Sequence, residues 1–83
     1  MPTIARFYGI VIKVYFRDHG TPHFHAVYAE HIGVFDIATL KLIEGDLPVR
    51  AQRLVREWGQ IYRAELARMW DTQEFRQLPG LDQ

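Results

Sequence analysis

Three of the four histidines of this 83-residue chain lie within one segment of eight residues. The segment runs from Asp18 to His25 and reads DHGTPHFH, so a carboxylate directly precedes the first imidazole. Neutral imidazole is the commonest metal ligand in proteins, and it is the side chain that titrates closest to neutral pH. The segment therefore indicates metal binding, proton transfer or a pH-sensitive contact, and the residue types alone do not separate these.

Metal binding is the first interpretation of the cluster. His23 and His25 are two residues apart, and side chains at that spacing share one face of a strand. Two imidazoles on one face can bind the same divalent transition metal, such as zinc, and a third protein group then completes the site. The candidates for that third ligand are His19, Asp18, His31 and Glu65. Of these sets we take His23, His25 and Glu65 as the candidate metal ligands.

Two other interpretations remain open. In one, the histidines stack on aromatic rings and form hydrogen bonds with backbone or carboxylate groups. In the other, Asp18 or Glu65 orients one imidazole as a general base. The candidate catalytic residues are therefore His23, His25, Glu65, Asp18 and His19. Whether the protein is an enzyme stays undecided at this level.

Composition excludes several kinds of chemistry. The chain has no cysteine, so it contains no disulfide, thiolate metal site or catalytic thiol, and it has no serine for a serine nucleophile. Ten basic residues balance ten acidic ones, so no overall field attracts nucleic acid or anionic lipid. No apolar run approaches the roughly 18 residues that span a bilayer. We expect a cytoplasmic protein with no membrane partner.

Hydrophobic periodicity predicts an α+β fold. Alternating apolar residues predict short strands over residues 3–8, 10–16, 23–29, 32–38 and 40–44. Pro48 suits the first turn of a helix, and apolar residues then recur at helical spacing to about Trp70. The prediction is one domain over residues 1–83, in which an antiparallel sheet of four or five strands packs against one long C-terminal helix. It divides into a sheet-rich half (1–46), a helical half (47–77) and a loose tail (78–83).

Glu65 is the polar residue that this helix would place toward the sheet. On a helical wheel it falls within an arc of roughly 100° that contains most of the large apolar side chains. That arc holds Leu54, Trp58, Ile61, Tyr62 and Met69. A carboxylate there needs a partner, because an unpaired buried charge is costly. We expect Glu65 to converge with His23 and His25 where sheet meets helix, or else to reach water or an arginine.

The helix also carries a basic face. Arg53, Arg56 and Arg63 lie opposite the apolar arc, where they could contact phosphates or an acidic partner, although a solvated helix face is the commoner explanation. The predicted sheet is rich in aromatic residues, which could stack bases but more commonly form a core. These are Tyr8, Tyr15, Tyr28, Phe24 and Phe35.

The pattern as a whole resembles a small prokaryotic family catalogued as domain of unknown function 4160. The resemblance rests on MPTI at the start, Asp18-His19, the PHFHAVY segment from Pro22, GDLP from Gly45, and Trp58 followed by Glu65-Leu66 and Trp70. The chain differs from the family pattern by Thr21 in place of a proline and Tyr62 in place of a histidine. The characteristic polar positions of the family fall on Asp18, His19, His23, His25 and Glu65.

The resemblance implies a genetic context. Members of the family are typically encoded beside a small partner protein, and such pairs have been proposed to act as toxin and antitoxin. One functional hypothesis is therefore a toxin-like component that uses the His and Glu residues for metal-assisted or acid-base cleavage of RNA. The other is a non-catalytic module that binds a cognate partner protein and whose histidines are structural. Unpaired sheet edges also favour a homodimer.

Overall fold

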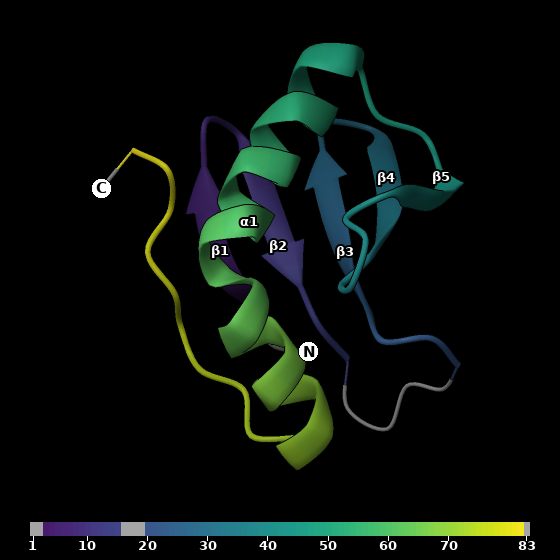
Figure 1. Ribbon diagram of the computed structural model, residues 1–83. Helices are drawn as coiled ribbons and strands as arrows, with labels where there is room; N and C mark the ends of the chain where they lie inside the picture. The colour runs from purple at the N-terminus through teal and green to yellow at the C-terminus, as the bar shows by residue number, and fades with distance from the viewer. Residues whose placement is uncertain (1–2, 16–19, 83) are drawn as a thin grey trace.

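A computed structural model describes residues 3–15 and 20–82 of the chain. Five antiparallel strands form one sheet in the order β1-β2-β3-β4-β5, and one long helix crosses a face of it (Figure 1). The elements are β1 (Thr3–Phe7), β2 (Ile10–Lys13), β3 (His23–Tyr28), β4 (His31–Asp36), β5 (Leu42–Gly45) and α1 (Val49–Thr72). The predicted α+β fold, an antiparallel sheet packed against one C-terminal helix, is confirmed.

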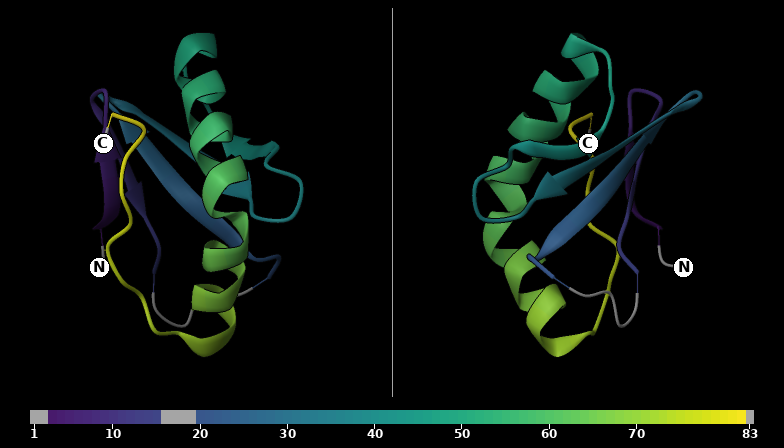
Figure 2. Two further views of the ribbon diagram at one scale, coloured as in Figure 1. Left: turned by 60° about the vertical axis from the view of Figure 1, so that its left-hand side comes forward. Right: turned by 90° about the vertical axis from the view of Figure 1, so that its right-hand side faces the viewer.

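The central strand β3 shows how the sheet divides its side chains between two faces. Phe24 and Ala26 are fully buried, whereas the alternate residues His23, His25 and Val27 are only half-buried. Strand geometry requires this alternation, because successive side chains point to opposite faces. Figure 2 shows α1 on one side of the sheet only, so the two faces have different environments.

The core lies between the sheet and α1 and is centred on Trp58. The indole ring is fully buried, and its centroid lies 5.7 Å from the Phe7 ring and 5.9 Å from the Phe24 ring. Phe24 in turn stacks on Phe35 of β4 at 5.5 Å. Aromatic rings from two strands therefore contact one helical residue, and a ring from a third strand packs behind them. In the part of the chain that the structure describes, no helix combines the length and apolarity needed to cross a bilayer.

The buried face of α1 differs from the predicted one. Its buried residues are Ala51, Val55, Trp58, Gly59, Leu66 and Met69. This stripe is turned by about 60° from the predicted arc on a helical wheel. Ile61, which the prediction placed in the arc, is 64% exposed, and Glu65 is only half-buried at the flank of the stripe. The sheet therefore packs against one of two adjacent apolar faces of α1, and Glu65 does not point into the core.

The C-terminal segment packs against the rest of the domain up to residue 82. After Gln73 ends the helix in a left-handed conformation, residues 74–82 return beside β1 (Figure 1). The amide of Leu78 donates to the carbonyl of Ile4 at 2.7 Å, and the indole Nε1 of Trp58 donates to the carbonyl of Pro79 at 2.8 Å. The predicted tail over 78–83 is thus incorrect for residues 78–82. They cover one edge of the core.

Substitution of Leu78 measures how firmly this segment is held. Leu78→Ala removes a side chain that is only 7% exposed, so we expect the free energy of unfolding to fall by about 2–3 kcal/mol. Urea denaturation followed by tryptophan fluorescence gives the value. Glu74→Ala, at an exposed position of the same segment, is the control and should change stability by less than about 0.5 kcal/mol. If the two variants are equally stable, the Leu78 side chain does not stabilise the fold, and the prediction of a loose tail is correct.

Candidate functional site

Two of the three clustered histidines lie in a row of four rings. The row contains Tyr15, just after β2, then His25 and His23 of β3, and finally Trp70 near the end of α1. Successive ring centroids are 4.6, 5.3 and 5.0 Å apart. All four side chains are half-buried. We call this arrangement the ring row; it connects the sheet to the last turns of the helix.

His23 has a defined tautomer. Its Nδ1 lies 2.7 Å from the carbonyl oxygen of Thr21, and a carbonyl can only accept, so Nδ1 carries a proton and donates it. The lone pair of the neutral ring is therefore on Nε2. Backbone carbonyls fix metal-binding and catalytic histidines in the same way. Of the two ring nitrogens of His23, Nε2 is the one that could act as a base or a ligand.

His25 is held by packing. Strand alternation turns its side chain away from Phe24 and Ala26, which face the core, and its ring meets the Tyr15 ring edge-on at an interplanar angle of 90°. Edge-to-face contacts between aromatic rings are favourable. The Nε2 atom of His25 is buried from solvent. The ring contacts of both histidines and the backbone bond of His23 therefore agree with the interpretation in which the histidines stack on aromatic rings and form hydrogen bonds with the backbone.

Glu65 does not join the histidines. Its carboxylate forms an ion pair with Arg76 of the C-terminal segment, and its other oxygen lies 3.8 Å from Arg68 Nη1. The alternative in which Glu65 reaches an arginine is thus confirmed. The predicted convergence of His23, His25 and Glu65 is incorrect: within residues 3–15 and 20–82, no three or more His, Cys, Asp or Glu side chains form a group that could hold a metal ion. Strand alternation and the turned helix face separate them.

The remaining candidates are placed as follows. Asp18 and His19 lie outside the described residues. His31, considered as a third metal ligand, begins β4, and its Nδ1 lies 4.0 Å from a carboxylate oxygen of Asp46. It therefore has an acidic neighbour of its own.

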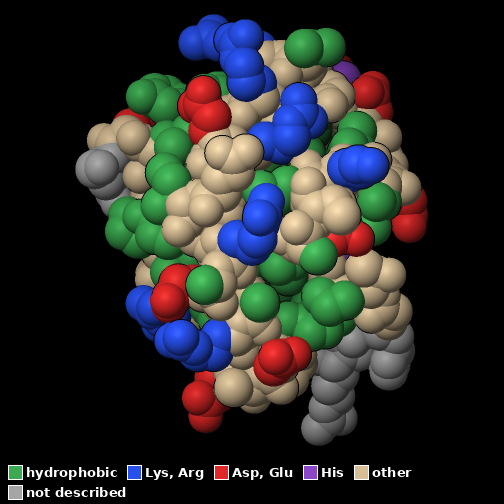
Figure 3. Space-filling view, viewed as in Figure 1, with side chains coloured by type: hydrophobic (Ala, Val, Ile, Leu, Met, Phe, Trp, Pro, Cys, Tyr) green, Lys and Arg blue, Asp and Glu red, His purple; other side chains and the backbone are tan. Residues whose placement is uncertain are grey.

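The basic face of α1 is present on the surface. Arg53 and Arg63 are exposed and Arg56 is half-buried. Figure 3 shows Lys and Arg side chains gathered along the exposed side of the helix, mainly over its first half. This agrees with a solvated helix face and leaves contact with a partner or phosphate as a prediction.

The sequence interpretation missed three residues that complete these contacts. Tyr15 and Trp70 belong to the ring row, and Arg76 neutralises Glu65. Tyr15 could have been found from strand alternation. Lys13 pairs with His25, and Tyr15 follows Lys13 by two residues, so its side chain lies on the same face of the sheet as His25. Trp70 and Arg76 had no such signal, because their positions depend on where the helix ends and how the chain returns.

Comparison with known families gave one result. The sequence model described as "Domain of unknown function (DUF4160)" matches residues 9–71, which is most of the chain. Neither the curated proteins nor the solved structures gave a match. The matched region includes β2 to β5, both histidines of β3 and nearly all of α1.

Replacing Trp70 tests whether the ring row supports the fold. Trp70→Ala removes the indole that contacts His23 and should lower the free energy of unfolding by about 1–3 kcal/mol. Urea denaturation followed by circular dichroism measures the loss. Trp70→Phe keeps an aromatic ring and should lose less than half as much. An alanine variant as stable as wild type would show that the row does not hold the helix end.

Proposed function

Because the chain belongs to the DUF4160 family, a domain of unknown function, we propose that it acts as a non-catalytic protein-binding module. In this proposal it is one member of a toxin-antitoxin-type pair in the cytoplasm, and its histidines serve the fold. The observation that carries the proposal is that the described candidate residues are engaged within the molecule: His23 with Thr21, His25 in the ring row and Glu65 with Arg76.

This engagement argues against a catalytic role for the same residues. A general acid or base must reach a substrate proton at hydrogen-bond distance, directly or through one water. The Nε2 atom of His25 is buried, and the carboxylate of Glu65 already neutralises an arginine. Ring contacts at 4.6 to 5.3 Å are instead the distances at which aromatic side chains stabilise a fold.

The partner is a small cognate protein encoded nearby, as the family resemblance implies. The surface offers large apolar side chains for such a contact. Those with at least half of their surface exposed include Tyr8 at 55%, Ile32 at 56%, Ile61 at 64% and Val49 at 77%. A homodimer through the outer edge of β5 is the other arrangement that the sheet allows, since β5 ends the strand order.

Coexpression with the product of the adjacent gene tests the proposal. We expect a stable complex of defined stoichiometry in size-exclusion chromatography with light scattering. His23→Phe keeps a ring beside Trp70 while removing the imidazole, so the variant should bind the partner as wild type does.

The same experiment separates the alternatives. A wild-type protein that elutes alone or only as a homodimer beside the adjacent product contradicts the proposal. Loss of the complex in a folded His23→Phe variant would mean that the imidazole contacts the partner, so the histidines would not be purely structural.

RNA cleavage by a pair of histidines is the second candidate function, and one observation favours it. The bond from His23 Nδ1 to Thr21 places the lone pair of the neutral ring on Nε2, and the His25 ring lies 5.3 Å away. With its lone pair on Nε2, His23 could serve as the general base in cleavage of a phosphodiester, and the neighbouring His25 ring would position it.

Growth arrest on expression discriminates between the two functions. If the histidines are structural, wild type and His23→Phe should have the same effect on growth, and neither purified protein should shorten a labelled RNA. Circular dichroism establishes that the variant is folded. Arrest and RNA cleavage by wild type, both abolished in a folded His23→Phe, would replace the first proposal by the second.

A further inference from the structure

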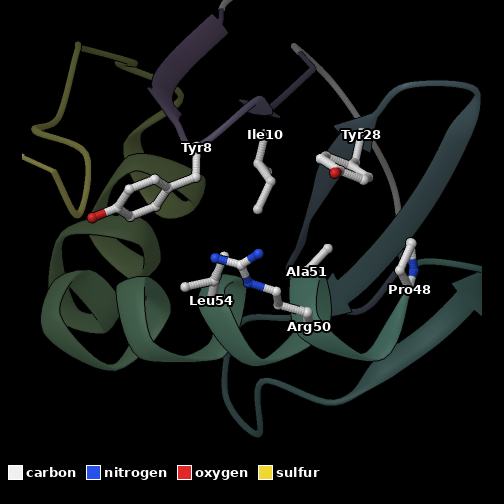
Figure 4. A pocket seen from close by; sticks show the side chains of 7 residues that line it. All are labelled: Tyr8, Ile10, Tyr28, Pro48, Arg50, Ala51 and Leu54. Atoms are coloured by element: carbon white, nitrogen blue, oxygen red, sulfur yellow. The ribbon is translucent and has the colours of Figure 1, made fainter.

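An apolar groove lies at the end of the molecule away from the ring row. The turn between β1 and β2 meets the first turns of α1 there and encloses a volume of about 250 Å³. Figure 4 shows Tyr8 and Ile10 on one side and the helix residues on the other. The lining residues are Tyr8, Ile10, Tyr28, Pro48, Arg50, Ala51 and Leu54. None of them belongs to the histidine cluster.

Tyr8 occupies an unfavourable backbone position in this groove. Its φ is +50°, and it is followed by Gly9 at +80° in the two-residue turn of the β1–β2 hairpin. Such turns favour Asn or Asp before the glycine, because bulky residues are strained at positive φ. Leu40 has a similar φ of +61°, but its side chain is 1% exposed and fills the core. Tyr8 is 55% exposed, so core packing does not account for it.

The floor of the groove is preformed and apolar. Ile10 and Ala51 are buried, at 1% and 4% exposure, and Tyr28 is half-buried beside them. Gly9 lies beside the Tyr28 ring, and its φ of +80° is a conformation that glycine adopts without strain. Tyrosine and arginine around a buried apolar floor are the residues that dominate binding energy in protein interfaces.

The rim of the groove carries an arginine. Arg50 is exposed and is the one charged residue among those that line the groove. The acidic residue that precedes the helix, Asp46, lies 4.0 Å from His31. A carboxylate on an occupant would therefore complement Arg50.

We infer that this groove binds a segment of the cognate partner protein in which an apolar side chain lies next to a carboxylate. The apolar side chain would lie against Ile10 and Ala51, the Tyr8 ring would cover it, and Arg50 would pair with a carboxylate. The inference rests on the proposed function. A second copy of this chain fits less well, because the symmetric contact would bring the Arg50 side chains of the two copies together.

Two variants test the groove against the adjacent gene's product, with isothermal titration calorimetry as the measurement. Tyr8→Asn removes the ring and installs a residue that the turn favours, so the unfolding midpoint should stay equal or rise while the Kd rises about tenfold or more. Arg50→Glu should raise the Kd by a similar factor through repulsion of the carboxylate. Lys41→Glu, a charge reversal at an exposed position that does not line the groove, is the control and should leave the Kd within about twofold.

The outcomes separate the groove from the proposed function. If wild type binds the adjacent product and both groove variants bind within about twofold of it, the groove inference is overturned and the proposed function stands. If wild type does not bind that product, both are overturned. Binding of a labelled single-stranded RNA of about 12 nucleotides that Arg50→Glu abolishes, or a homodimer that Tyr8→Asn dissociates, would also overturn it by assigning the groove another occupant.

Discussion

The packing of Trp58 against the sheet is the interaction on which the rest of the structure depends. Its fully buried indole contacts Phe7 of β1 and Phe24 of β3, and its Nε1 donates to the carbonyl of Pro79. One side chain thereby joins the edge of the sheet, its centre and the returning C-terminal segment. A tryptophan buried with its N–H satisfied combines large apolar burial with directional hydrogen bonding. This combination sets the rotation of α1 about its own axis.

That rotation, together with the kink in α1 at Tyr62, determines the chemistry at both ends of the helix. At the C-terminal end it brings Trp70 to His23 and leaves Glu65 at the flank, where Arg76 neutralises it. At the N-terminal end it presents Ala51 to Ile10 and Arg50 to the rim of the apolar groove. The histidine end is closed by internal contacts, whereas the groove end is open, and this contrast supports a domain that works by binding a partner.

Much of the architecture could be predicted from local patterns. The alternation along PHFHAVY correctly placed His23 and His25 on one face, because the strand period of two is a property of the backbone. The helix from Pro48 was also predictable from its spacing. The ring contacts and the backbone bond of His23 were foreseen as one alternative among three. Glu65 was the failure: α1 had two adjacent apolar faces, one with Ile61 and one with Val55 and Leu66, and the wheel favoured the wrong one.

The amino-acid sequence by itself determined the elements, their order and the face that each strand residue occupies, because these follow from backbone periodicity and turn chemistry within a few residues. Only the tertiary structure decided the rotation of α1, the course of residues 74–82 and therefore the partner of Glu65. Those features depend on contacts between residues far apart in the chain, such as Trp58 with Pro79 and Leu78 with Ile4. The groove beneath Tyr8 has the same origin, since its two walls are separated by some forty residues.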